Sequence, residues 1–329
     1  MSQSALAGFW HPIATVDDIT DQPKRFTLLD DYVVAFRDEE GVAAFRDLCI
    51  HRGAALSLGW VRNGTLVCPY HGWQYDRAGA CVRIPSRPAD APIPSTARAK
   101  AYRVQEKYGL VWVAMEEPRA EFPAFPDDVD TPSWKYFLSY RRVWNTSAAR
   151  AVENFMDFSH FPYVHEGLLG TEETAEIAPY TVEKLDNGLH YWLEQEEPSD
   201  LYGAGGTQKV RYEYTLVVPF TIHLKKIEIG TGRETVITQF TLPMTESSTE
   251  LFVVIARNHS HDEPDSKFGD FTTTIMEQDR TIVESQRPEK LPESLREELH
   301  IKVPDAASLL YRQRLASLAK VEAFGPYGA

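Results

Sequence analysis

Cysteine is scarce in this chain, with three residues among 329. So few cysteines argue against a disulfide framework and for a reducing compartment, which we expect to be the cytoplasm. The sequence also lacks any apolar run long enough to span a bilayer. Its opening residues, Met1-Ser2-Gln3-Ser4-Ala5, lack the basic and apolar regions of a signal peptide. We therefore expect a globular chain with no membrane partner.

Positive charge is in deficit as well. The chain has 34 lysines and arginines against 48 aspartates and glutamates, which gives a formal net charge of -14. An acidic chain of this kind is disfavoured as a partner of nucleic acid, because the phosphate backbone attracts basic surfaces. We therefore expect no nucleic-acid role.

A dinucleotide-binding fingerprint is also missing. The segments Gly203-Ala204-Gly205-Gly206 and Gly230-Thr231-Gly232 approach the pattern G-x-G-x-x-G. They lie between predicted antiparallel strands and not in a strand–turn–helix unit, so hairpin turns are the better interpretation. Any nicotinamide or flavin that serves this chain is therefore expected on another protein.

Two of the three cysteines stand close to a histidine. They occur in Cys49-Ile50-His51 and Cys68-Pro69-Tyr70-His71. Two thiolates and two imidazoles suit either zinc or an iron–sulfur cluster. The order Cys, His, Cys, His fits a Rieske [2Fe–2S] centre, in which both histidines hold one iron, whereas a zinc finger usually runs Cys, Cys, His, His. A structural zinc turn and a chance pairing remain the alternatives. The third cysteine, Cys81, is expected to be a small apolar core residue.

The residues around these ligands carry a resemblance. Cys49-Ile50-His51-Arg52-Gly53 and Cys68-Pro69-Tyr70-His71-Gly72-Trp73 resemble the Rieske signature of the aromatic-ring-hydroxylating oxygenase family, the Rieske non-haem iron oxygenases. The resemblance implies a [2Fe–2S] cluster held by Cys49, His51, Cys68 and His71.

The segment that carries this signature is basic, although the chain is acidic. Six arginines and two aspartates give residues 46–88 a net charge of +4. The arginines either solvate a small β domain or form a basic collar that docks an acidic electron donor. They are Arg46, Arg52, Arg62, Arg77, Arg83 and Arg87.

A second constellation runs from Asn154 to His165. Asn154, Asp157 and His160 recur at i, i+3 and i+6, which predicts one side of a helix that Ser147 caps and Pro162 stops. His165 is expected to turn back from the following loop. Two imidazoles from one helix end provide two ligands of a 2-His-1-carboxylate iron site, although such a pair is often merely polar surface or core.

This segment resembles the catalytic motif N-x-x-D-x-x-H-x-x-x-x-H of the same family, which implies that His160 and His165 bind iron. The resemblance places the carboxylate ligand at Asp279 in the segment from Met276 to Gln286, with Glu277 and Glu284 as competitors. Gln278 stands where relatives often have an acid. Asn154 is expected close to the iron without ligating it.

The resemblance implies a further role for Asp157. Its carboxylate is expected to join His160 to His71 of a neighbouring subunit, because a buried carboxylate can accept a hydrogen bond from each imidazole. This implies a head-to-tail homotrimer. The alternative is that Asp157 orients His160 alone.

The fold expected from these patterns is α+β. Residues 1–116 are predicted to form a small all-β Rieske domain, and the proline-rich residues 117–140 a linker. Residues 141–329 are predicted to form a catalytic domain with a central antiparallel sheet, from strands within 179–258, flanked by helices. The helices are expected over 148–160, 266–286 and 305–323.

The resemblance implies the oxygenase component of a multicomponent system. Such a component uses O2, a Rieske cluster and a mononuclear Fe(II), with electrons from a ferredoxin and an NAD(P)H-dependent reductase, or from a fused reductase. The chain is compact, like the branch that demethylates methoxybenzoates and methylxanthines. We expect monooxygenation of a methyl or alkyl group on an aromatic or heterocyclic substrate, with release of formaldehyde after demethylation.

Other functions are compatible with these sequence patterns. Within the family they are ring dihydroxylation and hydroxylation without dealkylation. Outside it they are a Rieske electron carrier, which would have no use for a second metal site, and a zinc-bound structural module.

The substrate pocket is the least specified part. Phe155, Phe158 and Phe161 lie near the expected iron ligands and are candidates for its wall, although aromatic residues on a helix are more often core. His223 stands on a predicted strand expected to cross the pocket, where it would bond the substrate; surface or core is the alternative.

Overall fold

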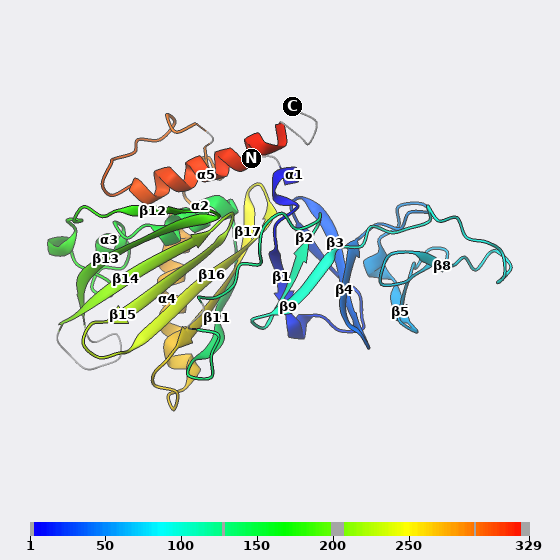
Figure 1. Ribbon diagram of the computed structural model, residues 1–329, viewed down its shortest axis with the longest axis horizontal. Helices are drawn as coiled ribbons and strands as arrows, with labels where there is room; N and C mark the ends of the chain where they lie inside the picture. Colours follow the sequence, from blue (N-terminus) through cyan, green and yellow to red (C-terminus); the bar gives the residue numbers. More distant parts are fainter. Residues whose placement is uncertain (1–2, 127–128, 199–206, 293, 324–329) are drawn as a thin grey trace. The chain divides into compact units, whose positions relative to one another are not determined.

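The computed structural model describes residues 3–126, 129–198, 207–292 and 294–323 (Figure 1). The chain forms two compact units. Leu6–Glu121 make up one, and the chain from Phe122 onward, with the first five residues, makes up the other. Among the described helices, none combines the length and the apolar character that crossing a membrane requires.

The first unit is built from three antiparallel sheets. One sheet has the order β1 (His11–Thr15), β10 (Leu110–Ala114), β9 (Arg103–Lys107). The next has the order β2 (Lys24–Leu28), β3 (Asp31–Asp38), β4 (Gly41–Arg46). The last has the order β5 (Trp60–Arg62), β6 (Thr65–Val67), β7 (Gln74–Tyr75), β8 (Cys81–Arg83). Short helices lie at η1 (Val16–Asp18) and η2 (Leu56–Leu58), whereas α1 (Gln3–Leu6) belongs mostly to the other unit.

The core of this unit surrounds the two metal-binding cysteines predicted from the sequence. Phe36 on β3 and Phe45 on β4 are fully buried in a cluster that also contains Cys49, Cys68 and Tyr75. Burying such aromatic side chains is a main source of stability in a small β unit. The loops that carry the cysteines are therefore anchored in an apolar core.

The second unit contains one seven-stranded sheet in which every pair of neighbours is antiparallel. Its order is β11 (Lys135–Trp144), β17 (Ser248–Arg257), β16 (Glu234–Thr245), β15 (Thr221–Glu228), β14 (Thr207–Val217), β13 (Gly188–Pro198), β12 (Val182–Leu185). The predicted turn Gly230-Thr231-Gly232 joins β15 to β16, and residues 203–206 lie outside the described residues.

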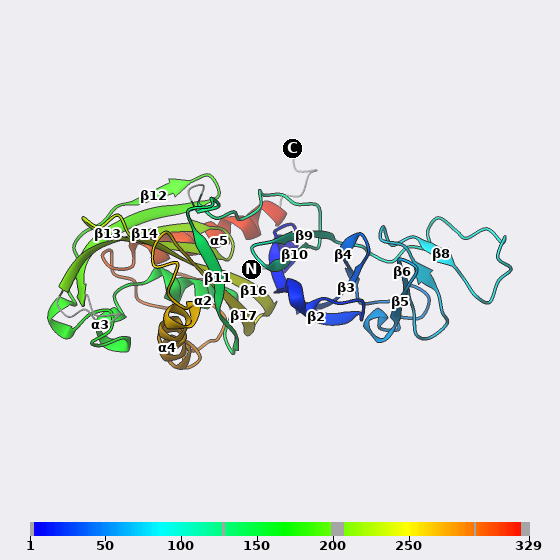
Figure 2. The same ribbon diagram turned by 90° about the horizontal axis from the view of Figure 1, so that it is seen from below.

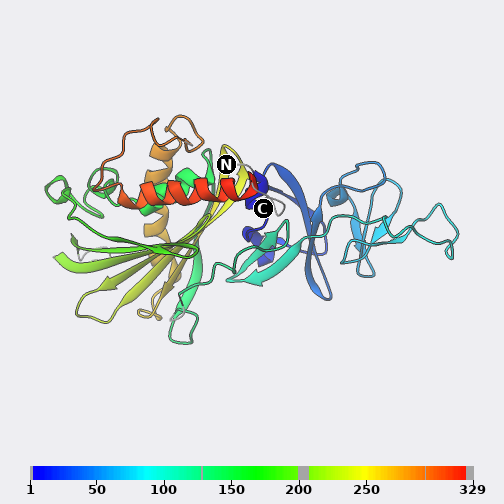
Figure 3. The same cartoon turned by 45° about the horizontal axis from the view of Figure 1, so that its top comes forward.

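Helices cover one face of this sheet (Figures 2 and 3). They include α2 (Ala148–Met156), α4 (Asp265–Val283) and α5 (Ala306–Ala323), which contact the sheet. The short helices α3 (Phe161–Val164) and η3 (Glu172–Thr174) follow α2 in the chain and contact each other. The predicted α+β class is confirmed, with an antiparallel sheet flanked by helices. β11 begins at Lys135, so residues 135–140 of the segment expected as a linker are a strand of the sheet.

The structure corrects one predicted helix. The helix capped by Ser147 ends at Met156 and does not continue to His160. Asp157 has an extended backbone, and its carboxylate accepts hydrogen bonds from the backbone N–H groups of Ser159 and His160. Local bonds of this kind compete with helix formation. Pro162 does not stop a helix; it stands in the first turn of α3, where its missing N–H costs nothing.

Candidate metal centres and substrate cavity

The two cysteine loops have the same backbone geometry. The N–H of Cys49 donates to Ala54, and the N–H of Gly53 donates back to Cys49, both at 2.8 Å. In the other loop the N–H of Cys68 donates to Trp73 at 2.8 Å, and that of Gly72 donates to Cys68 at 3.0 Å. Both glycines have φ of 69°, a left-handed conformation that glycine adopts without steric cost.

These loops bring the four predicted ligands together. The Cys49 and Cys68 side chains are buried, whereas His51 is half-buried and His71 is exposed. The Nδ1 atoms of the two imidazoles face each other at 3.2 Å. Two thiols on the inner side and two matching ring nitrogens on the outer side fit a Rieske cluster, with one iron toward the core and the other toward the surface.

The surroundings of the sulfurs suit a thiolate. Burial raises the pKa of the Cys68 thiol, while hydrogen bonds from the backbone N–H groups of Tyr70 and His71 act to lower it. Such donors stabilise negative sulfur once a metal has displaced the proton. Cys49 Sγ lies 3.1 Å from the hydroxyl of Tyr75. Cys81 lies in the apolar core, as expected.

The second candidate centre joins α3 to α4. His160, His165 and Asp279 place their ligand atoms within 4.8 Å of one another. Oδ1 of Asp279 is 3.2 Å from the Nε2 atoms of both histidines, and Asn154 Nδ2 donates to it at 3.3 Å. The three side chains therefore converge from two separate elements on one point.

The outer edge of each imidazole is held by a hydrogen bond. Nδ1 of His160 lies 2.8 Å from Asp157 Oδ2, and Nδ1 of His165 lies 2.8 Å from Gln278 Oε1. Because both partners are acceptors, each Nδ1 carries a proton, and each Nε2 is the nitrogen that can turn a lone pair to a metal once any proton on it is displaced. Both Nε2 atoms are buried and make no hydrogen bond, although they lie within ion-pair distance of Asp279. Two lone pairs and a carboxylate around one point fit a 2-His-1-carboxylate iron site.

The electrostatics of this cluster are those of a cation site. Burial acts to lower the pKa of His160, but the hydrogen bond to Asp157 and the carboxylate of Asp279 outweigh it and raise that pKa to about 9. Burial acts to raise the pKa values of Asp157 and Asp279, but their interactions with the histidines lower both. Without metal the cluster thus retains a proton that a bound cation would displace.

The other acids of α4 lie elsewhere. Glu277 accepts from the Tyr140 hydroxyl and pairs with Arg280, and Glu284 accepts from the backbone N–H of Asn145. Asp279, and neither of its competitors, joins the histidines. Sequence reasoning missed the contact of Gln278 with His165. Only the fold shows that two successive residues of α4 serve this site: Gln278 is next to the Nδ1 of His165, and Asp279 joins the metal ligands.

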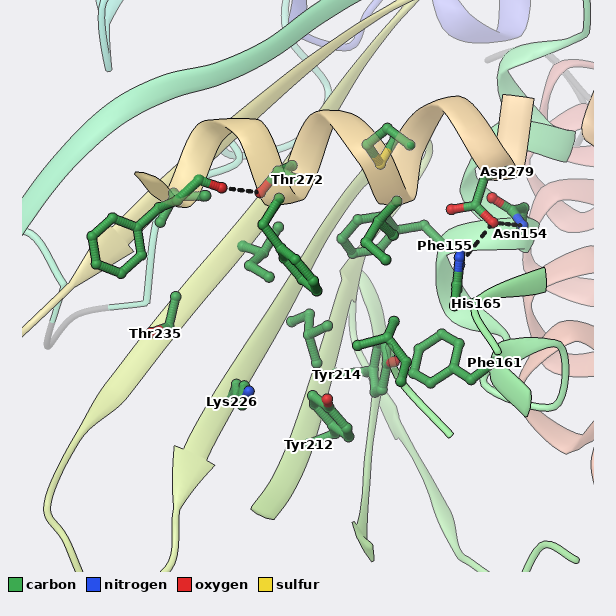
Figure 4. A pocket seen from close by; sticks show the side chains of 18 of the residues that line it. Asn154, Phe155, Phe161, His165, Tyr212, Tyr214, Lys226, Thr235, Thr272 and Asp279 are labelled. Carbon is green, nitrogen blue, oxygen red and sulfur yellow. Dashed lines mark hydrogen bonds and ion pairs between the residues drawn. The ribbon is translucent and has the colours of Figure 1, made fainter. Parts of the chain in front are cut away.

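A cavity of about 930 Å³, including its open mouth, extends from this centre between α4 and the sheet (Figure 4). One stripe of α4 forms a wall, with residues spaced at three and four positions so that they share a helix face. These are Phe268, Phe271, Thr272, Ile275, Met276 and Asp279. The helix face that lines the cavity thus also presents the carboxylate.

The sheet forms the opposite wall through residues that are paired in register and so point to the same face. One row is Tyr214, Leu224, Ile237 and Ile255, and the next is Tyr212, Lys226 and Thr235. Sequence reasoning missed these residues. Their alternation along each strand was the available signal, but the sequence did not show which face meets α4.

The residues expected at the substrate pocket divide into two groups. Phe155 and Phe161 line the cavity. Phe158 is buried among tyrosines, with its ring centroid 5.2 Å from that of Tyr180. His223 is on the sheet face away from the cavity, where it is 2.8 Å from Thr238 Oγ1. Strand alternation puts its neighbours Leu224 and Lys226, and not His223, toward α4. The placement of His223 and Phe158 does not support the substrate contact expected of them.

Comparison with known proteins supports the two kinds of metal cofactor. Residues 9–103 match the family described as Rieske [2Fe-2S] domain, and residues 144–321 match the vanillate O-demethylase oxygenase C-terminal domain. The chain is 31% identical to methylxanthine N1-demethylase NdmA of Pseudomonas putida, over 97% of this chain and 91% of the relative. It is 30% identical to methylxanthine N3-demethylase NdmB of the same species, over 86% and 82% of the two chains.

The fold is similar to a solved structure of NdmA from Pseudomonas putida CBB5, with a TM-score of 0.85 at 30% identity. The likeness covers 98% of this chain and 94% of that one. The resemblance stated from the two sequence motifs is thus confirmed over nearly the whole chain. The chain belongs to the Rieske non-haem iron oxygenases, oxidoreductases that use a Rieske [2Fe–2S] cluster, a mononuclear iron and O2.

Proposed function

We propose that this oxygenase removes a methyl or other small alkyl group from nitrogen or oxygen of an aromatic or heterocyclic substrate. The observation that carries the proposal is the largely apolar cavity that ends at His160, His165 and Asp279. Its walls suit a flat apolar ring, and its inner end leaves a carbon of the substrate next to the metal ligands. The activities named for the relatives NdmA and NdmB, demethylation of methylxanthines at N1 and at N3, support it.

The reaction inserts one oxygen atom of O2 into a methyl C–H bond. The substrate loses two electrons, the electron donor supplies two more, and with two protons the second oxygen atom leaves as water. The hydroxymethyl group on nitrogen or oxygen then breaks its C–N or C–O bond and leaves as formaldehyde, while the heteroatom keeps a proton. The iron, when bound, supplies the site where O2 is activated.

The residues of the chain hold the parts of this reaction in place. His160, His165 and Asp279 would hold the iron from one side, and Asp157 and Gln278 fix the two imidazoles through Nδ1. Aromatic and aliphatic side chains between α4 and the sheet exclude water and orient the ring. Asn154, bonded to Asp279, keeps the carboxylate oriented.

We also propose that the electrons come from a ferredoxin with a reductase, or from a fused reductase, and that three copies of the chain form a head-to-tail ring. The exposed edge of His71 supports docking at the cluster.

A surface hollow beside His160 contains Asp157 and is bordered by the exposed apolar side chains of Ile282 and Leu299. Such a hollow suits the cluster edge of a neighbouring copy, with Asp157 between His160 and the neighbour's imidazole. None of the three cysteines forms a disulfide, which supports a cytoplasmic location.

Product analysis tests the proposed function. Purified oxygenase with both metal centres, reduced by a surrogate ferredoxin and reductase, is incubated with a panel of N-methyl and O-methyl aromatic compounds. We expect formaldehyde in proportion to the demethylated product. A substrate that yields a vicinal diol, or a hydroxylated product that retains its methyl group, would show instead a dihydroxylase or a simple hydroxylase.

A further inference from the structure

The outer part of the cavity contains a polar group that the reaction does not use. Lys226 is on the wall formed by β15 (Figure 4). It is two residues along the strand from Leu224 and therefore points to the same face. Among the described residues that line the cavity, it is the one lysine, and none is an arginine. The positive charge available to a bound substrate, apart from the metal centre, therefore depends on Lys226.

This charge is already neutralised. The ammonium of Lys226 pairs with the carboxylate of Glu197 on β13, whose side chain is fully buried. Gln208 Nε2 donates to the same carboxylate at 3.0 Å, and the Tyr212 hydroxyl donates to its other oxygen. Burial and the Glu197 carboxylate raise the pKa of Tyr212 well above its usual range, so the hydroxyl keeps its proton. Glu197 is thus a fixed negative partner that an incoming ligand cannot displace into water.

A second acid stands next to this pair. Glu228 lines the cavity two residues along β15 from Lys226, on the same face of the strand. Among the described residues, its carboxylate pairs with the exposed Arg233 at 3.9 Å and accepts a hydrogen bond from the neutral hydroxyl of Thr231 at 3.5 Å. The polar end of the cavity therefore offers a hydrogen-bond donor but no net positive charge.

We propose, resting on the function proposed above, that the cavity selects uncharged substrates: Lys226 donates a hydrogen bond to a neutral acceptor such as a carbonyl oxygen, and carboxylates and sulfonates are rejected. An anion would lose its water of hydration and find a cation already paired, with a carboxylate at its side. The ammonium of Lys226 has three donor protons, and Glu197 does not use all of them. A neutral acceptor needs only one that is left over.

The shape of the cavity sets the size of such a substrate. The lining stripe of α4 runs from Asp279 to Phe268, a span of twelve residues whose eleven steps cover about 16.5 Å at the helical rise. Its apolar walls take one or two fused rings between the iron end and Lys226. The substrate class is thus a neutral methylated aromatic or heteroaromatic compound with an acceptor remote from the methyl group.

Matched amides and carboxylates test this inference, because they share size and shape but differ in charge. The probes are 4-methoxybenzamide with 4-methoxybenzoate, and 6-methoxy-2-naphthamide with 6-methoxy-2-naphthoate. Binding to the metal-loaded, reduced protein is measured by calorimetry without O2. We expect the amide of the better-fitting pair to bind at least about tenfold more tightly than its carboxylate. This is the effect of one repulsive contact between two negative charges in surroundings of intermediate dielectric constant.

Two substitutions separate the roles of the pair. Glu197→Gln frees the charge of Lys226, so the preference for the amide is expected to shrink about tenfold or to reverse. Lys226→Met is expected to weaken amide binding about tenfold, the loss of a hydrogen bond to a charged group, without improving carboxylate binding. Lys225→Met and Glu194→Gln are the matched controls. Lys225 shares β15 with Lys226, and Glu194 shares β13 with Glu197, but each points to the opposite face of its strand. Neither control is expected to change the ratio of amide affinity to carboxylate affinity.

Carboxylates that bind the wild-type protein as tightly as the amides, or a protein that binds neither member of either pair, would overturn the proposal. If Glu197→Gln does not fold, Glu228→Gln serves in its place and is expected to shrink the preference. Formaldehyde release from the bound amide is scored separately. Selective binding without formaldehyde counts against demethylation alone, whereas formaldehyde from a preferred carboxylate counts against the charge selection alone.

Discussion

Replacing Asp157 by asparagine removes the acceptor that holds the outer edge of His160. The Asp157 carboxylate accepts from Ser159 through Oδ1, at 2.6 Å from Oγ and 3.1 Å from the backbone N–H. Oδ2 accepts from His160, at 2.8 Å from Nδ1 and 3.1 Å from the backbone N–H. An asparagine keeps one oxygen for one of these pairs and turns its NH2 group, a donor, toward the other.

The expected loss of iron affinity follows from the hydrogen bond between Asp157 and His160 that the substitution weakens. A hydrogen bond between a carboxylate and a histidine N–H contributes about 1.5–3 kcal/mol, and loss of such a partner of a metal ligand lowers metal affinity by about 10–100-fold. We therefore expect Asp157→Asn to bind Fe(II) about 10–100-fold more weakly. At saturating iron it is expected to retain both centres yet turn over much more slowly, since the proposed bridge between His160 and the neighbouring cluster is weakened.

The assay is anaerobic Fe(II) titration against a competing chelator, followed by turnover at saturating iron. The visible absorption of the Rieske cluster reports on folding of the other unit. Ser159→Ala is the matched control, because it removes one bond to Oδ1 and leaves the Nδ1 contact of His160 in place. Parental iron affinity and parental turnover in Asp157→Asn would refute both roles assigned to this carboxylate.

Three other predictions follow from the same structure. Asp279→Ala is expected to lose the mononuclear iron and oxygenation while the cluster spectrum stays, whereas Glu277→Ala keeps both; iron analysis and visible absorption decide this. Cys49→Ala is expected to lose the cluster absorption, and Cys81→Ala to retain it. Burial lowers the pKa of His223 from 6.5 to about 4. The unfolded chain therefore binds more protons between these values, and the free energy of unfolding falls by up to about 3 kcal/mol as the pH drops from 6.5 to 4. Denaturant titrations should show His223→Gln flattening this dependence, and an unchanged slope would count against it.

The cluster loops were predictable from the sequence because their geometry is local. The spacing of Cys49, His51, Cys68 and His71 lies within two short turns, and Gly53 and Gly72 take the left-handed conformations that close them. The sheet was predictable for a similar reason, since long β-branched and aromatic runs with few breakers favour strands whatever their partners.

The rest depended on long-range pairing that a sequence does not display. Helix spacing suggested a continuous helix to His160, but the side-chain bonds of Asp157 end it at Met156. A shift of one residue reverses the face of a strand. That is why His223, predicted at the pocket, lies on the opposite face while Lys226 borders the cavity.

The central claim is that one chain holds two separate iron centres, one of them built by His160, His165 and Asp279. Its most direct test is iron and acid-labile sulfide analysis of the purified protein, alongside its O2 consumption when reduced with substrate. We expect about three irons for every two sulfides, as one [2Fe–2S] cluster and one lone iron require. Equal iron and sulfide, zinc in place of iron, or a reduced protein that consumes no O2 would contradict it.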